Sequence, residues 1–296
     1  MPDRGERATE REYAALKRKI TKEYKQAYKE VAKKGEDFLA AHKERDAKYR
    51  QMVEAGDMSK ADYAAWLRGQ VFQGKQWEAR KKQMADTLYN ADQTALQMTN
   101  KARFNVFAAN ANYTCKQINK DIGANASFHL YDAHTVQRLV KDNPDILPPR
   151  RIGKDKAYRW YNQRMNNAVT QGIIQGESIA DIALRIGRET GEGELSAMLR
   201  NARTGFTGAQ NAGRIEGLHQ AEELGIRVQK QWMATLDDRT RDTHADLDGQ
   251  VVDVDEPFIT SAGNEIMYPG DPDADPSEVW NCRCTLVYVY PDYDGD

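Results

Sequence analysis

Three side chains near the carboxyl end of this 296-residue chain have the types and spacing of metal ligands. Cys282 and Cys284 are separated by one residue, and His244 lies upstream of both. Thiolate sulfur and imidazole nitrogen are ligands that zinc prefers in tetrahedral protein sites. In an extended segment, residues two apart point to the same side, so both thiols could reach one ion. The pattern predicts a zinc site, provided that the intervening loop folds back.

This cluster supplies three ligands, whereas a closed structural zinc site has four. Asp237, Asp248 or a water molecule could take the remaining position. The alternative interpretation contains no metal. His244 would then form a hydrogen bond with a backbone or carboxylate group, and the two thiols would be small buried apolar side chains.

The same residues also allow a catalytic interpretation, in which the open coordination position holds a reactive water. A zinc-dependent hydrolase or nuclease of a toxin-like kind would use Asp237, Asp238 or Asp248 as general base. Residues 231–296 carry 16 acidic and 3 basic side chains, a charge that suits a polyanionic substrate poorly. The sequence also has no His-Glu-x-x-His, no nucleophile elbow and no Gly-rich phosphate loop. We therefore expect a binding or structural protein and assign no catalytic residue.

The formal net charge of −2 conceals a strong asymmetry along the chain. Residues 1–230 contain 40 basic and 29 acidic side chains, so any contact with DNA is expected through the basic N-terminal region. No window is apolar enough for a membrane span, and the first residues have no apolar segment for a secretion signal. These features predict synthesis in the cytoplasm and no membrane partner.

The elements that precede the cluster are predicted to be helical. Residues 9–48 and 59–118 are rich in good helix formers, with an N-cap at Ser59, so residues 1–120 should form an extended helical arm or hairpin. Gly69 and Gly74 are expected to bend or split the second run. Residues 121–153 are predicted to be a connector, because prolines at 144, 148 and 149 oppose helix.

Residues 154–296 are predicted to form one domain with an acidic C-terminal α+β subdomain. Helices are expected at 154–175, 178–186 and 194–224, with the glycines between 187 and 193 ending the middle one. Alternating apolar residues then indicate short strands at 251–254, 266–268 and 284–290. The predicted fold class is α+β, with a long N-terminal helical arm, a helical lead-in and a small, mostly antiparallel sheet.

The carboxyl-terminal region resembles the phage Mu F-like minor head proteins, the head-morphogenesis family of tailed bacteriophages. The resemblance extends from approximately residue 170 to residue 290. The motif positions are Trp232, Asp237, Arg239, Thr240, His244, Leu247, Gly249, Gln250, Asn281, Cys282, Arg283 and Cys284.

The resemblance implies a minor capsid protein of the virion, made in the host cytoplasm and located in the capsid interior or at the portal vertex. It implies head morphogenesis as the process, with a link to DNA packaging or delivery. The expected partners are the portal protein, the major capsid or scaffold protein, and packaged DNA through the basic N-terminal region. The helical arm lies outside the resemblance, and its apolar stripe is our own candidate for gripping a portal or coat protein.

Overall fold

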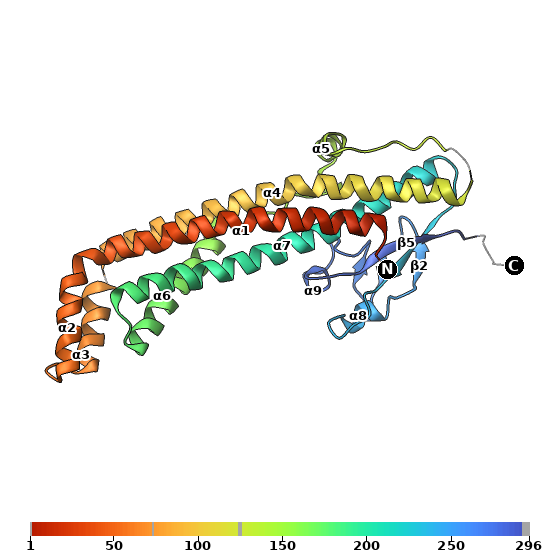
Figure 1. Ribbon diagram of the computed structural model, residues 1–296. Helices are drawn as coiled ribbons and strands as arrows, with labels where there is room; N and C mark the ends of the chain where they lie inside the picture. Colours follow the sequence, from red (N-terminus) through yellow and green to blue (C-terminus); the bar gives the residue numbers. More distant parts are fainter. Residues whose placement is uncertain (1, 73, 124–125, 292–296) are drawn as a thin grey trace. The chain divides into compact units, whose positions relative to one another are not determined.

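The computed structural model describes residues 2–72, 74–123 and 126–291 (Figure 1). The longer helices are α1 (Arg4–Leu39), α2 (Lys43–Ala55), α3 (Lys60–Trp66), α4 (Lys75–Asp121), α5 (Ala133–Asp142), α6 (Lys154–Gln175) and α7 (Ile179–Glu223). The C-terminal elements are β1 (Gln229–Met233), α8 (Asp242–Ala245), β2 (Val251–Asp253), β3 (Phe258–Ile259), β4 (Glu265–Ile266), α9 (Pro276–Val279) and β5 (Thr285–Val289). This arrangement confirms the predicted α+β class.

The N-terminal helix α1 forms because apolar residues recur on one side of it at steps of three and four. Leu16, Ile20, Tyr24, Ala27 and Val31 are all buried. The opposite side is charged, so burial of one stripe stabilises the whole helix. None of the helices in the described ranges is both long and apolar enough to span a membrane.

The second helical run is split, as the glycines at 69 and 74 predicted. Ser59 caps α3 by accepting a hydrogen bond from the backbone of Asp62 at 3.0 Å. A short π-helical turn at Leu67–Val71 follows, and Gly74 has a φ of 109°. Such a φ is readily adopted only by glycine, so the chain turns there before α4 begins at Lys75.

The prediction that glycines end a helix between residues 187 and 193 is wrong, because α7 continues through all of them. These glycines instead allow other chain segments to approach the helix closely. A Cβ atom at Gly191 would lie 2.0 Å from the Tyr28 ring, and one at Gly193 would lie 2.1 Å from the Arg164 guanidinium. Packing therefore outweighs the low helix propensity of glycine here.

The predicted connector at 121–153 contains one α-helix, α5. Asp132 caps this helix by accepting a hydrogen bond from the backbone N–H of Thr135 at 2.7 Å. Val136 is its buried apolar anchor. Beyond the end of α5, Pro144 opens a short 3-10 helix at Pro144–Ile146, and no helix forms at Pro148 and Pro149.

The chain packs as two compact units made from separate stretches. The sheet unit combines Met1–Lys17, Gln97–Arg150 and Leu199–Asp296, and the helical unit combines Arg18–Leu96 and Arg151–Met198. Each unit therefore combines residues from more than one of the predicted segments 1–120, 121–153 and 154–296. That division stays a prediction about sequence domains.

The sheet unit contains a three-stranded antiparallel sheet in the order β2-β1-β5, with Trp232 opposite Leu286. The strands β3 and β4 form a separate two-stranded hairpin, so the strand predicted at 266–268 pairs only as Glu265–Ile266. The sheet buries Trp232, Phe258 and Leu286 in a common core. The predicted small antiparallel sheet is thus confirmed.

Polar side chains of α7 hold β5 and the segment before it, which carries the two cysteines. Asn211 donates to the Pro269 carbonyl at 2.9 Å and accepts from the Leu286 backbone N–H at 3.0 Å. Thr207 donates to the Cys282 carbonyl at 3.1 Å. These buried hydrogen bonds satisfy backbone groups that the sheet does not pair, and they fix the cysteine segment on the helix.

Candidate metal centre

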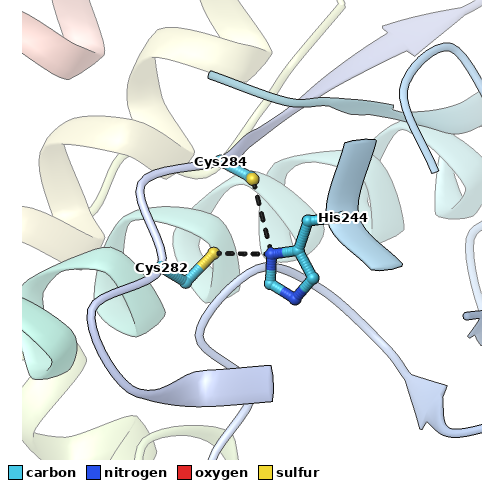
Figure 2. A group of neighbouring side chains, drawn as sticks. All are labelled: His244, Cys282 and Cys284. Carbon is cyan, nitrogen blue, oxygen red and sulfur yellow. Dashed lines mark hydrogen bonds between the residues drawn. The ribbon is translucent and has the colours of Figure 1, made fainter. Parts of the chain in front are cut away.

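The structure brings His244, Cys282 and Cys284 together in the sheet unit (Figure 2). His244 lies on α8, Cys282 follows α9, and Cys284 immediately precedes β5. The Nδ1 atom of His244 lies 3.6 Å from the sulfur of each cysteine. All three side chains are buried, with exposed fractions of 2% or 3%. The loop between His244 and the cysteines therefore folds back as the metal hypothesis required.

These separations fit a tetrahedral ion. Zn–S bonds of about 2.3 Å and Zn–N bonds of about 2.05 Å, at a tetrahedral angle, place sulfur and nitrogen about 3.6 Å apart. The two observed S···N separations have this value. The three ligand atoms all lie within 4.8 Å of one another. The group can therefore hold a metal ion with little rearrangement, and it leaves a fourth position for another ligand or water.

Contact between the two thiols shifts their pKa values in opposite directions. The hydrogen bond from the Cys282 thiol, followed by contact with His244, lowers the pKa of Cys284. The same contact with Cys284, together with burial, raises the pKa of Cys282. A metal binds cysteine sulfur as thiolate, so its binding at both residues would release any proton that they carry.

Asp237, the proposed fourth ligand, does not join this group within the described chain. Its Oδ2 accepts a hydrogen bond from Arg283 at 2.6 Å, and its Oδ1 accepts one from the Arg239 backbone at 3.0 Å. The Arg283 guanidinium, followed by that backbone bond, holds the pKa of Asp237 well below its usual range. Asp237 thereby ties the loop before α8 to the segment between the cysteines.

The side chains of Asp248, from the catalytic interpretation, and Thr240, from the motif, form hydrogen bonds with backbone groups. Asp248 accepts a hydrogen bond from the Ala234 backbone N–H at 2.8 Å. Thr240 donates from its hydroxyl to the Thr235 carbonyl. Both interactions lie within the turn that leads from β1 to β2. They shape the loop that presents His244.

The apolar motif residues pack around the histidine. The Trp232 ring stands edge-on to the His244 ring with centroids 5.2 Å apart, and it contacts Phe258 at 5.3 Å. Leu247 is buried in the same core. Gly249 has a φ of 79° and donates its N–H to the Trp232 carbonyl at 2.9 Å. This turn needs glycine because other residues rarely adopt such a φ.

Two further motif residues fix backbone at the edges of the site. Gln250 accepts a hydrogen bond from the Trp232 backbone N–H at 2.9 Å through its own carbonyl. Asn281 has a φ of 60°, a left-handed conformation that asparagine tolerates better than most residues. Its backbone N–H donates to Thr204 of α7 at 3.2 Å. The conformation at Asn281 lets the chain turn from α9 into the Cys-x-Cys segment.

Sequence reasoning missed Glu278, which lies beside the cluster. Its carboxylate is buried at 4% exposure, and its Oε2 lies 3.2 Å from Nε2 of His244. Glu278 occurs in an acidic stretch with many exposed carboxylates, so its residue type gave no signal. Its contacts with Thr243 and His244 of α8 are what distinguish it.

A second set of potential ligands, His219, Glu222 and Asp255, occurs at the surface of the sheet unit. His219 Nε2 lies 2.9 Å from Asp255 Oδ1, a hydrogen-bond contact between exposed side chains. Burial of Glu222, followed by repulsion from Asp255, raises the pKa of the Glu222 carboxyl. An exposed hydrogen bond accounts for this arrangement, so we assign no metal to it.

Comparison with known proteins relates this region to phage head proteins. Residues 163–287 match the family model described as "Phage Mu protein F like protein". The minor head protein GP7 of Bacillus phage SPP1 is 33% identical over 168 residues, which cover 56% of this chain and 53% of that protein. The uncharacterized protein YqbB of Bacillus subtilis (strain 168) is 30% identical over 169 residues, which cover 51% of this chain and 54% of that protein.

An enzyme is also similar to part of this chain. The NAD(+)--arginine ADP-ribosyltransferase EFV of Enterococcus faecalis is 41% identical over 127 residues, which cover 43% of this chain and 26% of that protein. The chain thus spans about half, or less, of the length of the curated relatives it matches. No solved structure matches it. The family match confirms the resemblance found in the sequence: residues 163–287, which include all three members of the metal cluster, match the phage Mu protein F-like family model.

Proposed function

We propose that this chain is a minor head protein of a tailed bacteriophage and acts in head morphogenesis. The observation that carries the proposal is the family match at 163–287 together with the similarity to the minor head protein of phage SPP1. The place of action would be the portal vertex or the procapsid interior. The partners would be the portal protein and the major capsid or scaffold protein, with roles in DNA packaging or delivery.

Loss of the chain from its phage is expected to prevent the formation of normal infectious particles. Wild-type virions should contain the protein in far fewer copies than the major capsid protein. Quantitative mass spectrometry of purified particles and procapsids would measure this, beside plaque titres of a deletion strain with and without a complementing copy. Absence of the protein from both kinds of particle, with an unchanged titre, would exclude the proposed role.

The metal centre is proposed to hold zinc in a structural role. Its support is the S···N separation of 3.6 Å and the near-complete burial of all three ligands. Burial suits an ion that joins chain segments better than one that must meet a substrate. The zinc-dependent hydrolase or nuclease is therefore not favoured. The similarity to the ADP-ribosyltransferase covers 26% of that protein and gives this chain no transferase role.

A basic stripe on α1 supports DNA as a further partner. It lies in the helical unit and consists of Arg18, Lys22, Lys25, Lys29 and Lys33, all of them exposed. The steps of four and three residues place these side chains on one face of the helix, opposite its buried stripe. The row extends over about 22 Å at 1.5 Å per residue. A row of cations of this length fits the backbone of a nucleic acid.

Charge reversal within this stripe is expected to weaken DNA binding. The variant Lys22→Glu/Lys25→Glu/Lys29→Glu should bind a short duplex more weakly, and its slope of log affinity against log salt should fall by roughly 2 to 3, since each phosphate contact contributes about 0.9. Fluorescence anisotropy over a salt series would measure both quantities on the full chain.

The matched control is Lys43→Glu/Lys48→Glu/Lys60→Glu, which changes net charge equally at exposed positions of the same unit. It should retain most of the wild-type slope. Equal losses in the two variants would mean that overall charge, rather than the stripe, determines binding.

A further inference from the structure

The two ring nitrogens of His244 have different neighbours. Nδ1 faces the sulfurs of Cys282 and Cys284, as Figure 2 shows. Nε2, on the other side of the ring, is buried and lies 3.2 Å from Oε2 of Glu278. That contact has the distance of an ion pair but not the alignment of a full hydrogen bond. A neutral imidazole that binds metal through Nδ1 carries its proton on Nε2, so the proton would face this carboxylate.

Glu278 is itself held by neighbours from two other segments. Its Oε2 accepts a hydrogen bond from the Thr243 hydroxyl at 2.9 Å, and its Oε1 accepts one from the Asn264 amide at 3.1 Å. Thr243 belongs to α8, and Asn264 lies in the turn between β3 and β4. A buried carboxylate is costly unless it is paired and hydrogen-bonded. The carboxylate is therefore fixed at the point where three segments meet.

We propose that Glu278 is a positioning residue for the metal centre: it orients the His244 ring through Nε2 and couples metal loading to the β3–β4 hairpin. The proposal rests on the structural metal proposed above. A carboxylate on the second nitrogen of a ligating histidine fixes the tautomer and increases the basicity of the ligand. Metal bound at Nδ1 in turn makes the Nε2–H a stronger donor. Metal binding would thus tighten the contact between His244 Nε2 and Glu278. Because Glu278 also binds Asn264, metal binding would order the β3–β4 hairpin.

The charge of Glu278 can be separated from its shape. In Glu278→Gln, the side chain keeps its volume and one oxygen, which can still accept from Asn264 or from His244. The variant loses the negative charge that faces the ring. If Glu278 only fills space in the core, Glu278→Gln should leave the metal affinity unchanged. If Glu278 positions His244, the affinity should fall.

The experiment is a metal-affinity measurement on the full purified chain. Wild type, Glu278→Gln and Glu265→Gln would be titrated with Co²⁺, and Zn²⁺ would then compete against a chelator of known affinity. Glu265 is an exposed carboxylate on β4, so its variant is the matched control. We expect Glu278→Gln to weaken metal binding by about 10- to 100-fold, and the control to bind as wild type does.

Two further readouts separate positioning from folding. Far-UV circular dichroism of the metal-free proteins should coincide, so that a loss of affinity cannot reflect unfolding. The visible spectrum of bound Co²⁺ should shift in Glu278→Gln, and Asn264→Ala should show a smaller loss of affinity.

The outcomes are distinct. Wild-type affinity and an unchanged cobalt spectrum in Glu278→Gln would overturn the positioning role while leaving the metal centre intact. A loss of affinity explained by the unfolded fraction of the variant would also overturn it. If the wild-type chain bound neither Co²⁺ nor Zn²⁺, the structural metal would fail, and the role of Glu278 would fail with it.

Discussion

Wild-type protein is expected to purify with about one zinc ion per chain, and the Cys282→Ser and His244→Ala variants with none. Each substitution removes one of three buried ligands. Because the ion joins α8 to the segment before β5, its loss should also lower thermal stability strongly. Structural zinc sites contribute on the order of 10 kcal/mol of apparent binding free energy at neutral pH. Metal analysis by mass spectrometry, beside thermal unfolding, would measure both effects.

Cys115→Ser is the control for this experiment. Cys115 is a buried thiol on α4 that donates to the Gly217 carbonyl at 3.9 Å. It lies outside the metal cluster, so its variant should keep the ion even if some stability is lost. A wild-type chain that remains metal-free after incubation with zinc, or a Cys282→Ser chain that retains a full equivalent, would refute the structural metal.

The second large effect is expected at Gly213 of α7, where substitution by alanine should destabilise the sheet unit by about 2 kcal/mol. In an exposed helix the same change would stabilise by about 1 kcal/mol. Here the added Cβ atom would lie 2.4 Å from the Phe107 carbonyl oxygen of α4. Backbone cannot rotate away as a side chain can, so the two helices must separate. The midpoint of urea denaturation would report the loss.

Gly205→Ala in the same helix provides the comparison. A Cβ atom there would lie 3.4 Å from the Arg103 side chain, which is an ordinary contact. We expect this variant to be neutral or slightly more stable than wild type. Equal destabilisation by the two substitutions would show that the approach of α4 at Gly213 is not the cause.

The sequence was sufficient to predict elements whose signal is local. The apolar stripe of α1 and the alternation in β5 each reflect a repeat within a few residues, and both elements formed. The helix at Lys154–Gln175 occurs at the predicted bounds. The Cys-x-Cys spacing likewise indicated that two thiols could act together. In each case the spacing of the residues matches the repeat of the local backbone, which is about 3.6 residues in a helix and two in an extended segment.

Errors occurred where a distant partner decided the outcome. Gly191 looks like a helix end in the sequence, but the ring of Tyr28 occupies the space that a side chain would need. Asp237 looks like a free ligand, but Arg283 binds it. Glu278 had no local signal, because its importance comes from contact with His244. A single sequence contains no direct record of such contacts.

The sheet unit is built from segments near both ends of the chain, and this constrains the order in which the chain can fold. Arg214 of α7 forms an ion pair with Asp3 at 2.6 Å, and Arg203 pairs with Glu10. Each pair joins residues that are about two hundred positions apart in synthesis. Contacts of such separation form late, since the intervening chain must be made and closed first. The start of α1 therefore reaches its final place only after α7 has left the ribosome, and the N-terminal segment of a nascent chain must wait without its partners until then.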